Sequence, residues 1–435
     1  MGALTSGHRT GGAVGRAVVA GLVLLALLTA AAAGAAAQPV ELEYWHFYAG
    51  LFAEMHDELV KEFNEAHPHI RVRPVYGGST WTMRDKLTVA LSAGRGPDVA
   101  SIDQFWIAQL ASGGYVVPVE EFFDKTPGFD AGDILPVYWE TARYRGRIWS
   151  MPFAASTVGL YYNEDLMRSL GLTEKDVPRT WSELVELGSR VLQDHPNERI
   201  WILDVPTTAQ TGVVYYFLLT LWQRHGDMFA DDYRSVVFHS QEGVETLAFW
   251  QDMVRKGLID LHRPDRAWES GRALFHIQSS ARILSAYANL PFEFGMAPLP
   301  YEKERVTGIG GRNLAILTDD PVKQEAAWTF IVWMTNGENN RRWSERTGYS
   351  PLRRSSYASA AFQELLRADP RVETALHEML YARPRPNIAA YGDASRVLGE
   401  AVERALYFDL DPAAVLQEAA AEANAVIQRY GEDGP

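Results

Sequence analysis

The residues of this sequence that could carry out chemistry are acidic pairs, a pair of histidines and a glycine-rich run. Glu120–Glu121 and Asp231–Asp232 are adjacent carboxylates, the groups that glycosidases use as acid, base or nucleophile. His67 and His69 flank a proline and could hold a metal ion, although weakly. The run GIGGRNL at 308–314 carries some of the glycines of a nucleotide-binding loop.

Each of these signals has a structural explanation that is favoured over catalysis. The chain has 55 acidic residues, so adjacent carboxylates are expected on solvated faces. The histidine pair falls at a helix-ending turn, and GIGGRNL precedes a strand instead of following one. The sequence has no G-x-S-x-G, H-E-x-x-H or G-K-[ST] motif, and no cysteine for a disulfide, thiolate site or thiol nucleophile. We therefore predict no catalytic residue, no resident metal and no cofactor.

The first 37 residues have the pattern of a secretory signal. Arg9 and Arg16 precede the apolar run AVVAGLVLLALL, and small residues follow it up to Gln38. We expect cleavage after Ala37, because signal peptidase accepts Ala-x-Ala. The alternative is an uncleaved anchor, since residues 17–37 are uncharged and about long enough to span a bilayer. Without a cysteine for lipid attachment, the mature protein is expected to be free in the periplasm or outside the cell.

The composition predicts a soluble acidic protein of more than one domain. The chain has 435 residues, of which 47% are hydrophobic and 22% charged. Removal of residues 1–37 loses two arginines and no acid, which shifts the formal charge from −14 to −16. Such a surface repels phosphate backbones and anionic lipids, so nucleic acids and membranes are not expected partners. An anionic ligand would need a locally basic pocket.

Hydrophobic periodicity predicts alternating strands and helices from residue 40 onward. VELEYWHFY alternates like a strand and leads into a helix that ends before Pro68, and IRVRPVYG and DVASID are further strands. Thr180 and Glu183 form a capping box at the start of a helix, while Asp320-Pro321 and Asp411-Pro412 each open another. Residues 201–280 are expected to be mainly helical. This alternation is typical of an α/β protein with a mostly parallel sheet covered by helices.

Two long stretches resemble the family 1 extracellular solute-binding proteins, the capture subunits of ABC importers. One is STVGLYYNEDLMRSLGL followed by PRTWSELVELG, and the other is AWTFIVWMTNGENNRRWSERTGYSPLRRSSY. The resemblance covers essentially the whole mature chain. Within the family the sequence is most similar to the glycerol-3-phosphate-binding (Ugp-type) proteins. The features that suggest this are the Trp45-His46 pair, the QSSARIL helix start and the SRVLGEAVERAL segment.

The resemblance implies an α/β fold of two lobes (the class II periplasmic-binding-protein type) joined by three crossovers, with the ligand in the cleft between them. The crossovers would be SMPFAAS, APLPYEKERVTGIGG and TGYSPL. The implied division assigns residues 1–37 to the signal, 38–150 and 309–348 to the N-terminal lobe, and 151–308 and 349–435 to the C-terminal lobe.

The resemblance also implies a set of ligand-binding residues, each with a plain structural alternative such as a helix cap, a turn or a core ring. Arg396 would pair with a phosphate, with Ser279, Gly311 and Tyr349 as further donors, and Trp181 would pack on a glycerol backbone. Two positions depart from the relatives' pattern: Thr80 stands where they have a tyrosine, and Gln104 where they have a glutamate. The complete set is Trp81, Gln104, Ser156, Trp181, Ser279, Gly311, Tyr349 and Arg396.

These implications lead to an expected function. The protein would be a monomer that captures sn-glycerol 3-phosphate or a glycerophosphodiester and delivers it to a membrane permease pair driven by a separate ATPase. The donor-rich cleft implied by the resemblance suits an anion better than a neutral sugar. A sugar-binding member of the same family is the first alternative, because the chain has 13 tryptophans. A secreted glycan-degrading enzyme is the alternative from another class.

Overall fold

The computed structural model describes residues 1–3, 38–209, 212–263 and 266–431. The expected signal and its cleavage site fall within residues 4–37 and so lie outside the described part. No helix in these described ranges has both the length and the apolar character needed to cross a bilayer.

The chain alternates strands and helices in the order that the sequence predicts. The strands are β1 (Val40–His46), β2 (Ile70–Tyr76), β3 (Val99–Asp103), β4 (Arg143–Tyr144), β5 (Arg147–Ile148), β6 (Met151–Asn163), β7 (Trp201–Asp204), β8 (Ala273–Ser279), β9 (Phe294–Ala297), β10 (Thr307–Ile316) and β11 (Ala382–Pro384). The helices are α2 (Leu51–Ala66), α3 (Thr80–Ser92), α4 (Ile107–Ser112), α5 (Pro136–Glu140), α6 (Glu164–Ser169), α7 (Trp181–Asp194), α8 (Val213–Gln223), α9 (Gln241–Arg255), α10 (Pro321–Thr335), α11 (Gly337–Thr347), α12 (Arg354–Tyr357), α13 (Ala360–Ala368), α14 (Pro370–Glu378), α15 (Tyr391–Phe408) and α16 (Pro412–Arg429).

The helix starts confirm the capping chemistry expected from the sequence. Thr180 accepts a hydrogen bond from the amide of Glu183, and the Glu183 carboxylate accepts one from the amide of Thr180 in return. Asp320 and Asp411 cap α10 and α16, each followed by a proline at the first helical position. Residues 201–280 are less helical than expected, because β7 and β8 lie at the two ends of that range.

The central sheet runs in the order β2-β1-β3-β10-β6-β8-β7, with β11 beside β10 and β9 beside β6. The expectation of a mostly parallel sheet is wrong in one respect. β1 pairs in parallel with β2 and β3, β7 with β8, and β10 with β11. However, β10 and β6 are antiparallel to each other, and β10 is also antiparallel to β3 and β6 to β8. These two strands lie in the middle of the sheet and join its two halves. The chain runs along β6 in one direction and along β10 in the opposite direction, which makes the two strands antiparallel.

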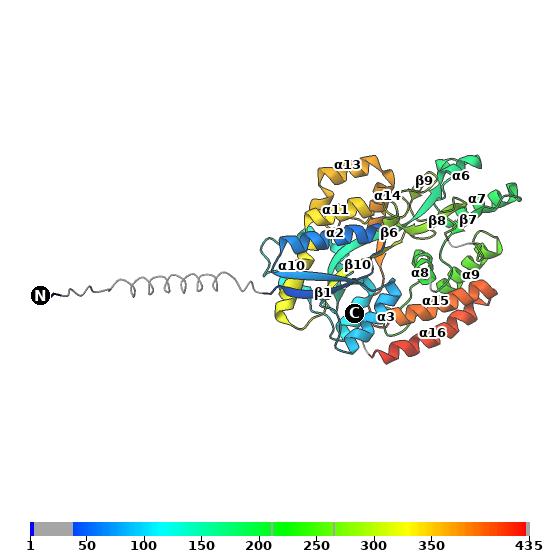
Figure 1. The fold of residues 1–435 in the computed structure, drawn as a ribbon. Coiled ribbons are helices and arrows are strands. Elements are labelled where there is room, and N and C mark those ends of the chain that lie inside the picture. The colour runs from blue at the N-terminus through cyan, green and yellow to red at the C-terminus, as the bar shows by residue number, and fades with distance from the viewer. Residues whose placement is uncertain (4–37, 210–211, 264–265, 432–435) are drawn as a thin grey trace.

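Two lobes lie on either side of β6 and β10 (Figure 1). We call the group around β1–β3, α2, α10 and α11 the first lobe, and the group around β7, β8, α7–α9, α15 and α16 the second lobe. One core fills the first lobe around Phe63 and Trp343, while another fills the second around Trp222 and Trp250. The second core also includes Leu87 of α3 and Phe105, whose ring centroid lies 5.4 Å from that of Tyr391 on α15, so the lobes are in apolar contact there. The lobe boundaries expected from the sequence stay predictions.

Candidate functional site

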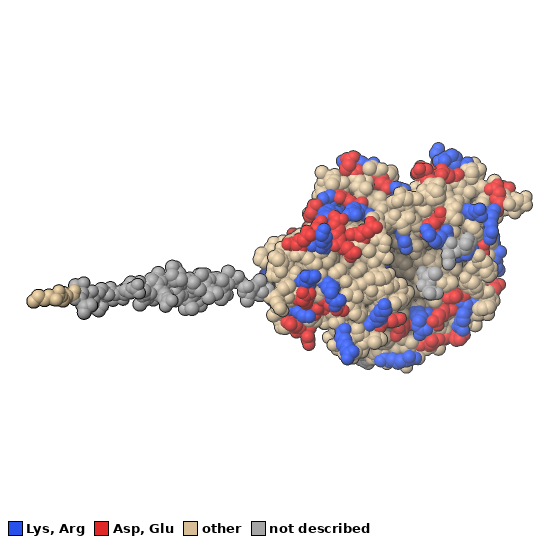
Figure 2. Space-filling view, in the orientation of Figure 1, with Lys and Arg blue, Asp and Glu red and all other residues tan. Residues whose placement is uncertain are grey.

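A cleft of about 510 Å³ lies between the lobes at the strand ends. Figure 2 shows the surface hollowed between the two halves of the molecule, with basic and acidic side chains intermixed around it. The cleft is lined by Phe47, Tyr48, Ala49, Phe52, Tyr76, Ser79, Thr80, Asp103, Ser156, Val158, Tyr215, Tyr216, Gln278, Ser279, Ala281, Arg282, Gly310, Gly311, Arg312, Tyr349 and Arg385. We refer to this surface as the interlobe cleft.

A buried carboxylate between two guanidinium groups forms one wall of the cleft. Asp103, at the end of β3, is 4% exposed. Its Oδ2 accepts a hydrogen bond from Arg312 at 2.8 Å, and its Oδ1 accepts one from Arg385 at 2.6 Å. The Arg312 guanidinium lies over the ring of Phe47, and that of Arg385 over those of Phe105 and Tyr215. Ion pairing and aromatic contacts therefore position both arginines before any ligand binds.

Arg282 is a third guanidinium in the cleft, and its surroundings differ from those of the other two. It is exposed and follows Ser279 at the turn after β8. No carboxylate pairs with it among the residues that the structure describes. Its charge is therefore available to an anion that enters the cleft.

Hydroxyl and amide groups complete the polar lining. Ser279 Oγ donates to Ser156 Oγ at 2.8 Å, which joins β8 to β6 across the cleft floor. Gln278 Oε1 accepts from the Tyr216 hydroxyl and the Ser279 amide, so its side-chain amide group can still donate. The Tyr215 hydroxyl is buried and has no partner among the described residues. Burial raises the pKa of both phenols above 10, so each hydroxyl keeps its proton and can donate.

Two adjacent glycines of β10 line the cleft for different reasons. A Cβ on Gly311 would come 2.2 Å from the carbonyl oxygen of Ala154, so the close approach of β10 to β6 requires glycine there. A Cβ on Gly310 would meet only Ser156 Oγ and the Tyr215 hydroxyl, both at 3.8 Å. Gly310 therefore leaves open the space that a ligand would occupy.

Tyr349 lies directly after α11, where the chain comes against β6. Gly348 ends α11 in the left-handed region with φ 79°, and the amide of Ser350 donates to the carbonyl of Ala155 on β6. The Tyr349 ring contacts Phe52 and Trp343, with centroids 5.5 and 6.1 Å away. Its ring is thus part of the first lobe's packing while its side chain lines the cleft.

The structure brings four of the eight sequence-predicted residues into the interlobe cleft: Ser156, Ser279, Gly311 and Tyr349. Two others lie in buried surroundings. Trp181 is 3% exposed, and its Nε1 donates to Gln223 within the second lobe's core. Gln104 is also 3% exposed, and its Nε2 donates to the carbonyl of Ile309. Neither side chain lines the cleft, because each is committed to packing or to a backbone group.

The remaining two, Trp81 and Arg396, lie together in a different place. They line a second cavity of about 570 Å³ between α3, α8 and α15. Arg396 is exposed there and forms an i,i+4 ion pair with Glu400 at 2.8 Å. The strong positive charge expected of Arg396 in the cleft comes instead from Arg282, Arg312 and Arg385.

The charged cleft residues that the sequence reasoning missed sit inside or beside motifs that it did use. Asp103 immediately precedes Gln104, Arg282 lies within QSSARIL, and Arg312 lies within GIGGRNL. Tyr76, which ends β2, supplies an aromatic ring to the cleft four residues before Thr80. The sequence around Arg385 gave no sign of a role in the cleft. Its RPRP context predicts an extended backbone but says nothing about which carboxylate the arginine pairs with.

Comparisons with known proteins place this geometry in a family. Residues 58–374 match the family described as bacterial extracellular solute-binding protein. The chain is 24% identical over 380 residues to the sn-glycerol-3-phosphate-binding periplasmic protein UgpB of Salmonella typhimurium, covering 82% of this chain and 85% of that protein.

Solved structures show the same two-lobe architecture. UgpB from Mycobacterium tuberculosis in complex with glycerophosphocholine superposes with a TM-score of 0.81 at 21% identity, covering 89% of this chain and 98% of that one. The cyclic alpha-maltosyl-1,6-maltose binding protein from Arthrobacter globiformis gives a TM-score of 0.77 at 26% identity, covering 90% and 100%.

Proposed function

We propose a ligand and a role for this chain, which belongs to the bacterial extracellular solute-binding protein family. The protein captures sn-glycerol 3-phosphate or a glycerophosphodiester in the interlobe cleft. It then delivers the ligand to the transmembrane permease of an ABC importer that is driven by a separate ATPase. The periplasmic relatives and the expected signal support capture outside the cytoplasmic membrane.

The observation that carries the proposal is the charge of the cleft. Among the described residues that line it, three guanidinium groups stand against one carboxylate, which leaves a net charge of two positive. The chain as a whole has a formal charge of −14. Positive charge concentrated in one partly enclosed place on an acidic protein attracts an anion and gives little advantage to a neutral sugar.

The cleft offers complementary groups for both ends of a glycerol phosphate. Arg282 and Gln278 would bind the phosphate oxygens, since both can donate hydrogen bonds. The Ser156 hydroxyl would donate as well, because it accepts from Ser279 and its own proton is not used there. Asp103 would accept a hydrogen bond from a glycerol hydroxyl, because a carboxylate has lone pairs beyond the two that its arginines use. The unpartnered hydroxyl of Tyr215, a residue of α8, would donate to the ligand.

Delivery requires the cleft to open and close. β6 and β10 pair with each other between the lobes, and cleft residues come from both sides. A ligand that contacts both lobes favours the closed state by its differential affinity.

Removal of the Tyr349 hydroxyl should weaken ligand binding without weakening the fold. The ring packs on Phe52 and Trp343, whereas the hydroxyl has no hydrogen-bond partner in the described part of the chain. Tyr349→Phe should raise the Kd about fivefold, the effect of one hydrogen bond of about 1 kcal/mol. Calorimetric titration with the ligand and a thermal melt of the free protein measure the two effects. Normal binding by the phenylalanine variant would reduce Tyr349 to a packing residue.

A sugar-binding function is the second candidate, because aromatic rings also line the cleft. Tyr48, Phe52 and Tyr76 could stack against a pyranose face. The Arthrobacter structure with the same fold is that of a saccharide-binding protein. The net positive charge of the cleft makes this the weaker candidate.

A thermal-shift panel separates the candidates. The mature protein is mixed with glycerol 3-phosphate, glycerophosphodiesters including glycerophosphocholine, maltose and other saccharides, and inorganic phosphate as a control for charge alone. The melting temperature should rise with the glycerol phosphate class and follow ligand occupancy. A rise with neutral sugars alone would favour the second candidate. A rise that decays with incubation would indicate turnover by a glycan-degrading enzyme.

A further inference from the structure

An ion pair joins the two lobes outside the interlobe cleft. Arg84 of α3, which lies between β2 and β3 of the first lobe, donates from Nη2 to Oδ1 of Asp393 on α15 of the second lobe at 3.3 Å. The Arg84 side chain is 13% exposed and that of Asp393 37%. The helices approach closely here, since a Cβ on Gly392 would lie 2.6 Å from the same Nη2. We call Arg84 and Asp393 the interlobe pair.

Each member of the interlobe pair is oriented by a residue of its own lobe. Gln109 Oε1 on α4 accepts a hydrogen bond from Arg84 Nη2 at 3.0 Å. Asp393 Oδ2 accepts one from the hydroxyl of Tyr430, directly after α16, at 2.6 Å. Neither bond crosses between the lobes, so both can persist when the lobes separate. The guanidinium and the carboxylate are thus held ready to pair again when the lobes meet, which lowers the entropic cost of pairing.

The segment that carries Asp393 also forms part of the cleft wall. Arg385, which lines the interlobe cleft, donates to Asp103 of the first lobe at 2.6 Å. Six residues later, the ring of Tyr391 packs on Phe105 of the first lobe, and Asp393 follows with its ion pair. A single stretch of chain therefore connects the cleft wall to the interlobe pair.

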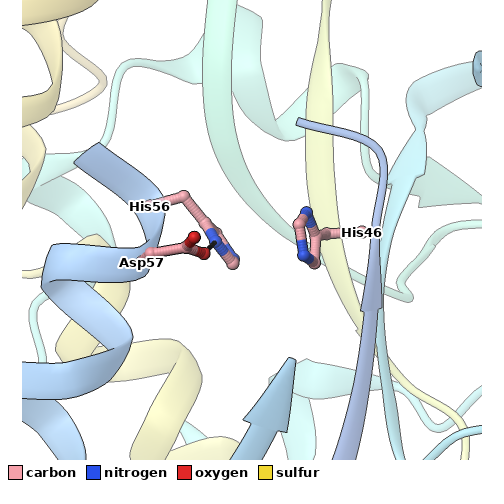
Figure 3. A group of neighbouring side chains, drawn as sticks. All are labelled: His46, His56 and Asp57. Atoms are coloured by element: carbon pink, nitrogen blue, oxygen red, sulfur yellow. Dashed lines mark hydrogen bonds and ion pairs between the residues drawn. The ribbon is translucent and has the colours of Figure 1, made fainter. Parts of the chain in front are cut away.

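The first lobe presents its side of the cleft from a rigid base. His46 at the end of β1 and His56 on α2 are buried, and their rings stack with centroids 4.2 Å apart (Figure 3). Asp57 Oδ1 lies 2.9 Å from His56 Nδ1. These three residues are close enough together for a metal ion, but stacked rings cannot direct their lone pairs at one point. The group therefore serves packing, and it holds β1 against α2 beside the loop that lines the cleft with Phe47 and Tyr48.

We propose that Arg84 is a positioning residue for ligand capture, because its pairing with Asp393 favours the closed arrangement of the lobes. A contact that exists only when the lobes are together contributes its free energy to closure. Neither residue lines the interlobe cleft, yet loss of the pair should weaken ligand binding, since the apparent Kd rises as the binding-competent fraction falls. This effect on affinity rests on the function proposed above, whereas the effect on the shape of the free protein does not.

Small-angle X-ray scattering of the mature, ligand-free protein is the first test. Arg84→Met keeps the aliphatic stem and removes the guanidinium, and Asp393→Asn keeps an acceptor for Tyr430 and removes the charge. Both variants should shift the radius of gyration to a larger value, because the open arrangement becomes more populated. A merely structural role in α3 or α15 would lower the melting temperature without this shift. An unchanged radius of gyration in both variants would overturn the proposal.

A double-mutant cycle measured by calorimetric titration with glycerol 3-phosphate is the second test. Each single variant should raise the Kd about three- to tenfold, the effect of losing one charged hydrogen bond that is partly open to solvent. The double variant should bind no more weakly than the weaker single variant, since both changes remove the same contact. Additive losses would contradict the proposal. If the wild type binds no glycerol phosphate, the proposed function fails, while the scattering result still decides on the interlobe pair.

The matched control is Arg404→Ala, which breaks an ion pair of α15 that stays within the second lobe. Arg404 lies 3.5 Å from Glu418 of α16, and the two side chains are 48% and 68% exposed. The radius of gyration and the Kd should both remain at their wild-type values. A shift in this control as large as that in Arg84→Met would show that any loss of charge between the helices has the effect, and the role assigned to Arg84 would be wrong.

Discussion

Arg282→Ala should weaken the binding of glycerol 3-phosphate by about 10- to 150-fold, because it removes the cleft cation that has no carboxylate partner in the described part of the chain. A hydrogen bond to a charged group contributes about 1.5–3 kcal/mol, and each 1.4 kcal/mol changes Kd tenfold. The side chain is exposed, so the free energy of unfolding should change little. Arg282→Lys should recover part of the affinity, since a point charge cannot reproduce the planar guanidinium.

Arg396→Ala is the matched control for this experiment. Arg396 was the phosphate-binding arginine implied by the resemblance, but it lines a different cavity and pairs with Glu400. We expect its replacement to leave ligand affinity unchanged in the same calorimetric titration. If Arg396→Ala lost affinity and Arg282→Ala did not, the phosphate position proposed here would be wrong.

Asp103→Ala should lower the free energy of unfolding by about 3–5 kcal/mol, the usual cost of removing one partner from a buried ion pair. Asp103 is 4% exposed, and its two oxygens are the acceptors for Arg312 and Arg385. Without the carboxylate, two guanidinium groups remain close together in partly buried positions. The side chain of Arg385 is only 12% exposed, so water cannot fully replace the lost partner.

Urea denaturation of the free protein measures this loss, with Glu400→Ala as the control. Glu400 also pairs with an arginine, but both side chains are more than half exposed. Exposed pairs contribute little, so the control should change stability by no more than about 1 kcal/mol. A loss below about 1 kcal/mol for Asp103→Ala would mean that the two arginines regain hydration when the carboxylate is removed.

Local sequence signals predicted the elements well, since each depends on neighbours in the chain. The capping box at Thr180 and the Asp-Pro starts of α10 and α16 satisfy free amides within one helical turn. The direction of β6 and β10 could not be read in this way. β6 and β10 pair with each other, although more than 140 residues separate their paired positions in the chain.

Four of the implied ligand residues meet in the cleft because the strands and the connection that carry them are adjacent in the fold. Ser156, Ser279 and Gly311 lie on β6, β8 and β10, which are hydrogen-bonded neighbours, and Tyr349 precedes Ser350, which pairs with β6. Gln104 and Trp181 have suitable chemistry, but their side chains are already used by Ile309 and Gln223.

The sequence by itself determined the α/β class, several helix starts and the family, because periodicity, capping and family motifs are local in the chain. Only the tertiary structure decided which arginines face the cleft. Arg385 and Arg396 are eleven residues apart, yet one is held over two rings beside Asp103 and the other pairs with Glu400 on an exposed helix face. The physical reason is that the environment of a long, charged side chain depends on contacts with distant segments. The same reason hides the pairing of His46 with His56, whose rings meet only when α2 packs against β1.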